Sequence, residues 1–78
     1  MQNCTDKIRM VLDAELLLIE IKIAKANGRD VLIYWNGQID LIQNIAKQYD
    51  LADEYEEKIE DMREAIYSES EDFARGIK

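Results

Sequence analysis

The side chains best suited to chemistry in this sequence are carboxylates that recur at helical spacing. Six of them lie three or four residues apart, so a helix would place them on one face. They are Asp53, Glu56, Glu57, Glu60, Asp61 and Glu64. Carboxylates grouped in this way can coordinate cations, transfer protons as general acids and bases, or form ion pairs with a basic partner.

Catalysis and specific metal binding both need residues that the sequence does not supply. There is no histidine and only one cysteine, Cys4, which excludes an internal disulfide and a zinc site of the usual nitrogen and sulfur type. No EF-hand loop or phosphate-binding glycine-rich loop is present. The acids that could turn inward, Glu15 and Glu20, have no nucleophile and base beside them. We therefore expect no catalytic residues, no metal site and no cofactor.

The acids are concentrated in one part of the chain. Residues 1–49 contain six acids and six bases, whereas residues 50–72 contain eleven acids and only two bases, Lys58 and Arg63. The formal net charge of -7 therefore originates in the segment 50–72. Its negative field attracts basic surfaces and repels phosphates, which predicts no direct contact with nucleic acid and no binding to anionic membranes.

The acidic helix predicts a protein partner with a basic surface. Carboxylates at this spacing approximate the separation of phosphates along a nucleic-acid strand, so the helix can enter the groove of a nucleic-acid-binding protein. Small acidic inhibitors of restriction and CRISPR complexes act in this way, and the analogy is one of charge and size. We predict a non-catalytic inhibitor or adaptor that binds such a partner through residues 53–64. Solubility of a small protein with apolar faces is the other interpretation of these acids.

Three helices are expected to carry these residues in a single domain, 1–78. The chain has no proline and is rich in helix formers, which favours long helices. Apolar periodicity predicts an all-α, small three-helix bundle with helices at about 5–26, 30–49 and 51–75. Thr5 and Asp30 are the expected N-caps, and Gly28 suits a left-handed position after the first helix.

A second local interpretation stays open for residues 18–35. Residues 19–23 alternate between apolar and charged side chains, and Asn27-Gly28 is a strong hairpin signal. A short β-hairpin at 18–35 is therefore the alternative to the end of one helix and the start of the next.

The first predicted helix has two apolar faces. The broader one holds Ile8, Val11, Leu12, Leu16, Leu18, Ile19 and Ile23. The other holds Met10, Ala14, Leu17, Ile21 and Ala24. A helix with two apolar faces packs on two sides, so the second face predicts a homo-oligomer, most simply a homodimer. The alternative function is therefore a structural or assembly subunit that oligomerises through this face.

Size and composition also bear on stability and location. A chain of 78 residues gains only about 3–5 kcal/mol from its core, and self-association is the remaining reinforcement when no disulfide or metal is available. A lone cysteine fits a reducing compartment, so we expect a cytoplasmic protein. The first residues lack the features of a signal peptide, and no apolar run is long enough to cross a bilayer.

Overall fold

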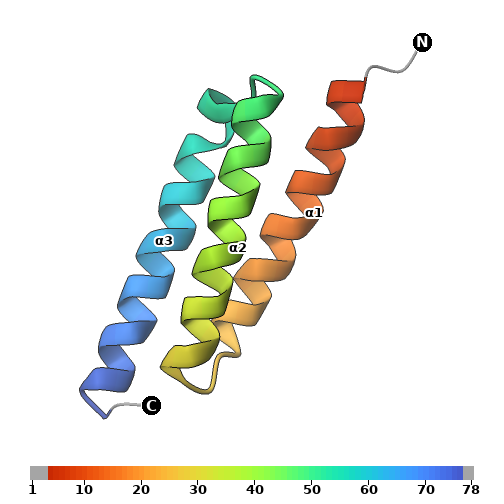
Figure 1. Ribbon diagram of the computed structural model, residues 1–78. Helices are drawn as coiled ribbons and strands as arrows, with labels where there is room; N and C mark the ends of the chain where they lie inside the picture. The colour runs from red at the N-terminus through yellow and green to blue at the C-terminus, as the bar shows by residue number, and fades with distance from the viewer. Residues whose placement is uncertain (1–3, 77–78) are drawn as a thin grey trace.

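Three α-helices in up-down-up order make up the computed structural model, which describes residues 4–76 (Figure 1). α1 spans Cys4–Ala24, α2 spans Arg29–Gln48 and α3 spans Ala52–Ala74. All three pack against one another, with α1 and α3 running in the same direction (Figure 1). The prediction of an all-α three-helix bundle is confirmed. Residues 18–35 form the end of α1, a short link and the start of α2, and the described residues 4–76 contain no strand.

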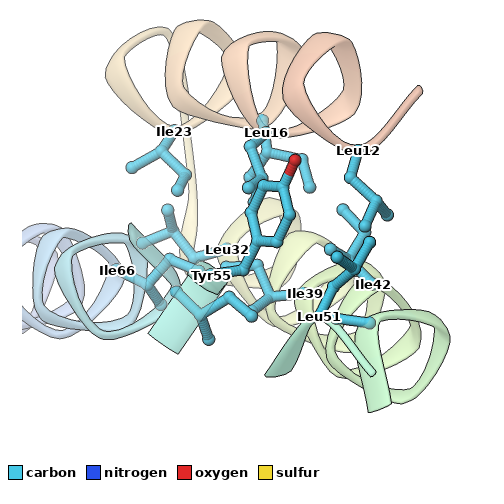
Figure 2. Packing of buried hydrophobic residues seen from close by; sticks show 12 residues of the cluster. Leu12, Leu16, Ile23, Leu32, Ile39, Ile42, Leu51, Tyr55 and Ile66 are labelled. Atoms are coloured by element: carbon cyan, nitrogen blue, oxygen red, sulfur yellow. The ribbon is translucent and has the colours of Figure 1, made fainter. Parts of the chain in front are cut away.

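One apolar core fills the space between the helices. Each helix contributes a stripe spaced three, four or seven residues apart, as an amphipathic helix does. The buried side chains are Leu12, Leu16, Ile19 and Ile23 of α1, Leu32, Ile39, Ile42 and Ala46 of α2, Leu51 before α3, and Tyr55, Ile59 and Ile66 of α3. Figure 2 shows Leu12, Leu16 and Ile23 pointing from α1 toward the other two helices.

The turn between α2 and α3 is closed by a left-handed residue. Asp50 has φ 63°, a conformation in which aspartate is among the better tolerated residues besides glycine. The amide of Leu51 donates to the Ala46 carbonyl at 2.7 Å, and the amide of Asp50 donates to the Lys47 carbonyl at 3.2 Å. These two bonds form a Schellman motif, whose apolar contact comes from buried Leu51. The turn therefore places α3 in register with the core.

The helix ends differ from the predicted caps. α1 begins at Cys4, so Thr5 lies within its first turn and is not the N-cap. The N-cap of α2 is Gly28, and Asp30 lies in the first turn. Gly28 has φ -177°, which is extended and not left-handed. The link begins with two backbone hydrogen bonds, from the Lys25 amide to the Ile21 carbonyl at 3.1 Å and from the Ala26 amide to the Ile23 carbonyl at 3.2 Å.

Four apolar residues of α1 and α2 that the helical periodicity places on core-facing sides are exposed, as is Tyr49, which follows α2. Val11 and Leu18 of α1 and Tyr34 and Leu41 of α2 all face solvent. Three helices of this length meet along narrow stripes, so residues at the edges of a broad apolar face lie beyond the contact. The bundle therefore buries less of α1 and α2 than their apolar content would allow.

Ile39 and Ile33, both on α2, provide a matched test of this core. Ile39 is fully buried and Ile33 is exposed. Ile39→Ala should cost about 2–5 kcal/mol, as much as the whole net stability of so small a protein, so the variant should be largely unfolded. Ile33→Ala should change the free energy of unfolding by less than about 0.5 kcal/mol. Urea denaturation followed by circular dichroism measures both, and equal losses would contradict this core.

Candidate interaction surfaces

Arg63 joins α3 to α2. It is the side chain of α3 that faces a polar stripe on α2, spaced at helical intervals. Its guanidinium donates to Asn36 Oδ1 at 3.0 Å, to Gln43 Oε1 at 3.0 Å and to Asp40 Oδ1 at 2.5 Å. The planar guanidinium suits several acceptors at once. Arg63 therefore stabilises the contact between α2 and α3.

A second polar group joins α3 to α1. Tyr55 is only 3% exposed, and Figure 2 shows its ring reaching from α3 through the core toward α1. Its hydroxyl donates to Asp13 Oδ1 at 2.8 Å and lies 3.2 Å from the Arg9 carbonyl oxygen. Lys58 Nζ is 3.7 Å from the same Asp13 oxygen and 5.7 Å from the centre of the Tyr55 ring. Lys58 is therefore directed to α1, as Arg63 is directed to α2.

These contacts shift the pKa of two groups at the α1–α3 edge. Burial is the main cause that raises the pKa of Tyr55 from 10.0 to about 12, and the hydrogen bond to Asp13 adds to it. The hydrogen bond to Glu54 is the main cause that raises the pKa of Arg9, whose Nε donates to Glu54 Oε2 at 2.8 Å. Arg9 also pairs with Asp6 on its own helix. The contact between α1 and α3 is thus made by the protonated forms of Tyr55 and Arg9.

The outer side of α3 carries the six predicted acids without compensation. All six of these residues are exposed, and we call them the acidic face: Asp53, Glu56, Glu57, Glu60, Asp61 and Glu64. Within residues 4–76, no ion pair includes any of them, whereas Glu54 at the flank pairs with Arg9. The two cations of the segment, Lys58 and Arg63, are both directed to neighbouring helices. The six acids therefore keep their charges without a salt bridge, although Lys58 lines the same groove as Asp61, and Lys47 of α2 lines the same pocket as Asp53 and Glu56.

The linear charge density of the acidic face is close to that of a nucleic-acid strand. Between residues 53 and 64 the helix rises by about 17 Å, which gives about one charge every 3 Å. One strand of DNA carries a charge about every 3.4 Å along the axis. Like charges at these spacings weaken a helix by about 0.2–0.5 kcal/mol per pair, so the arrangement costs α3 stability.

The outer side of α1 is apolar. The five residues predicted as an oligomer interface all face solvent, and we call them the outer apolar face: Met10, Ala14, Leu17, Ile21 and Ala24. They lie opposite the buried stripe of the same helix. Beside them, toward α2, lie the four exposed residues that the periodicity misplaced, which we call the apolar flank: Val11, Leu18, Tyr34 and Leu41. The periodicity identified the flank residues as part of the apolar faces, but it placed them in the core.

A groove of about 530 Å³ runs between α1 and α3 and borders both surfaces. It is lined by Asp13, Leu16, Leu17, Glu20, Lys58, Asp61 and Met62. In the part of the chain that the structure describes, no three acidic or cysteine side chains are grouped to hold a metal ion. Over the same residues, no helix is long and apolar enough to span a bilayer.

Comparison with known proteins gives no relative from which a role can be transferred. No protein-family model, curated protein or solved structure matches the chain.

Arg63→Met tests the contact between α2 and α3. The substitution keeps an apolar stem but removes the three hydrogen bonds to α2, and it should lower the free energy of unfolding by about 1–2 kcal/mol. Arg75→Met is the control, because Arg75 pairs only within α3 at 3.5 Å and is exposed. It should change stability by less than about 0.5 kcal/mol. Chemical denaturation compares the two, and an equal effect would refute the role of Arg63.

Tyr55→Phe tests the contact between α1 and α3 and predicts a pH dependence. At neutral pH the variant should lose about 1–2 kcal/mol, because the hydrogen bond to a carboxylate is removed. The folded protein holds the phenolic proton more tightly than the unfolded chain, with a pKa of about 12 against 10.0. Stability from this group is therefore complete below pH 10 and falls as the pH rises from 10 to 12.

The alkaline loss should be smaller in Tyr55→Phe than in the wild-type protein. Urea denaturation at a series of pH values between 9 and 12 gives both curves. All other groups are the same in the two proteins, so only the difference between the curves reports Tyr55. Parallel curves would show that the hydroxyl of Tyr55 is not held as the structure describes.

Proposed function

We propose that this protein is a non-catalytic interaction module that binds a basic, nucleic-acid-binding protein through the acidic face of α3. The protein acts as an inhibitor or an adaptor, because the acidic face occupies the surface on which the partner binds nucleic acid. Its site of action is the cytoplasm, in line with a chain that has a single cysteine.

One observation carries the proposal: the cations of α3 are directed away from its acids. Lys58 contacts Asp13 of α1, and Arg63 contacts Asp40 of α2. A solubilising surface needs charge of either sign and gains from mixing both signs. Here the two signs are separated around one helix, which concentrates the negative potential where a basic partner can approach.

The same arrangement supports mimicry of a nucleic-acid strand. The acidic face repeats its charges at about the axial spacing of phosphates, and it lies on a helix, which fits within a groove about 12 Å wide or more. Long-range attraction between such a face and a basic groove speeds association and weakens as salt rises. Competition with nucleic acid for the same groove follows directly from this mode of binding.

Two charge-matched variants test the proposal. One replaces Glu56, Glu57, Glu60 and Glu64 by glutamine. The control replaces Glu15, Glu20, Asp30 and Asp50 by the matching amides. Each variant removes four negative charges from a net charge of -7, and the control changes exposed acids outside the acidic face. Circular dichroism establishes that both remain helical.

The readout is the set of basic nucleic-acid-binding proteins that each form retains from a cell lysate at low salt, followed by release with a DNA duplex. We expect the wild-type protein and the control to retain the same partner, and the duplex to displace it. The variant of the acidic face should bind that partner at least about tenfold more weakly. Equal retention by both variants, or release of no basic protein by the duplex, would refute the proposal and leave solubility as the role of these acids.

A further inference from the structure

We propose that two copies of this chain pack through the outer apolar face of α1, antiparallel to each other, with the apolar flank of α1 and α2 completing the contact. This inference goes beyond the proposed function and does not depend on it, because it concerns another helix and another kind of contact.

The outer apolar face has the spacing of a helix-packing seam. Its five positions follow one another at intervals of four, three, four and three residues, which is the heptad pattern of helices that pack along their length. The buried stripe of α1 follows the same rule on the opposite side, at residues 12, 16, 19 and 23. A helix that is apolar on opposite sides is a buried helix, but in this protein only one side is covered.

The exposed apolar area is larger than a monomer usually presents. Met10, Val11, Leu17, Leu18 and Ile21 of α1 are each between 41% and 66% exposed. Five large side chains at this exposure approach or exceed the few hundred Å² of a typical largest patch. Tyr34 and Leu41, each more than half exposed, extend the surface toward the roughly 800 Å² per partner of a standard interface.

Helix geometry places the apolar flank beside the outer apolar face. The polar contacts at Asp13 and Arg63 put α3 on one side of both α1 and α2, so the flank residues lie at the α1–α2 edge. Leu18 is six residues before the end of α1, and Tyr34 is five residues after the start of α2, so both lie about 8–9 Å from the turn. Tyr34 also packs edge to face on Trp35, with ring centroids 4.9 Å apart, which orders its ring before association.

The charge distribution favours a second copy at this face. The protein carries a net charge of -7, but residues 1–49 sum to zero and the acids lie on α3. Contact through α1 therefore brings two acidic proteins together where their repulsion is least. At the edge of the seam, Asp6 and Asp13 are already paired with Arg9 and Lys58. Asp61 of the acidic face borders the contact, because it lines the same groove as Leu17.

The seam is self-complementary when two copies of α1 run antiparallel. If Ala14 faces Leu17 of the second copy, Met10 faces Ile21, so a small residue opposes a large one at the centre. Alternation of large and small side chains across facing positions is how helices fill the space between them. The same register brings Val11 of the flank near Leu18 of the second copy. An isologous pair of this kind closes with two-fold symmetry, and Ala24 then faces Lys7 of the second copy.

Sedimentation velocity over micromolar to millimolar concentrations tests the association. The wild-type protein should sediment as a dimer. Leu17→Gln with Ile21→Gln should weaken the dimer by about 100-fold or more, because four large side chains per dimer no longer gain from burial. These residues are exposed in one copy, so the helical circular dichroism signal should be retained.

The matched control is Ile33→Gln with Tyr67→Gln, which changes two exposed apolar residues outside the proposed contact. It should remain a dimer. A wild-type protein that is monomeric throughout the concentration range would overturn the proposal, as would a dimer that survives the substitutions at Leu17 and Ile21.

Disulfide trapping tests the direction of packing. Met10→Cys and Ile21→Cys are made separately, each with Cys4→Ser, and are oxidised alone and as a mixture. Antiparallel packing predicts a covalent dimer in the mixture and little in either protein alone, since residue 10 of one copy faces residue 21 of the other. Covalent dimers formed by each variant alone would show parallel packing and overturn this register.

Discussion

The arrangement of this protein depends on how the two cations of α3 are used. Arg63 holds α2 through Asn36, Asp40 and Gln43, and Lys58 meets Asp13 of α1 beside the Tyr55 hydroxyl. Each contact holds one side of α3 against a neighbouring helix. Apolar packing has no preferred direction, so these polar contacts help to set how α3 is oriented in the bundle. Both cations contact neighbouring helices, so neither forms a salt bridge with an acid of the acidic face. The interactions that orient the helix therefore also leave its acidic face without a paired cation.

A second constraint is the small size of the core. Two neighbouring helices cover only one stripe of α1, so the outer apolar face and the apolar flank remain outside the core. The two surfaces differ in chemistry and in the helix that carries them: one is charged, long-range and sensitive to salt, and the other is apolar and short-range. The proposed self-association through α1 and the proposed binding of a basic partner through α3 therefore do not compete for the same surface.

The apolar periodicity of the sequence predicted the three helices, but it did not predict which residues at the edges of their apolar faces are buried. Stripes such as Leu32, Ile39 and Ala46 identify α2 because burial selects them at helical spacing. Val11 and Leu41 were assigned to the core because a helical wheel shows direction and not how far a neighbour extends. The left-handed Asp50 was missed since the usual signal there is glycine. The acids of residues 53–64 were placed correctly on one exposed face, because repulsion and solvation keep unpaired charges outside. The contacts of Lys58 with α1 and of Arg63 with α2 could not be predicted from the sequence, because they join residues far apart in the chain.

The most direct test of the central claim, that negative potential is concentrated on the outer side of α3, is a titration of the ¹⁵N-labelled protein with a synthetic oligolysine, followed by NMR chemical shifts of the backbone amides. The account predicts that the largest shifts fall within residues 53–64, that they disappear as salt is added, and that residues 10–24 are unaffected. Shifts spread evenly over the acids of all three helices, or centred on α1, would contradict it.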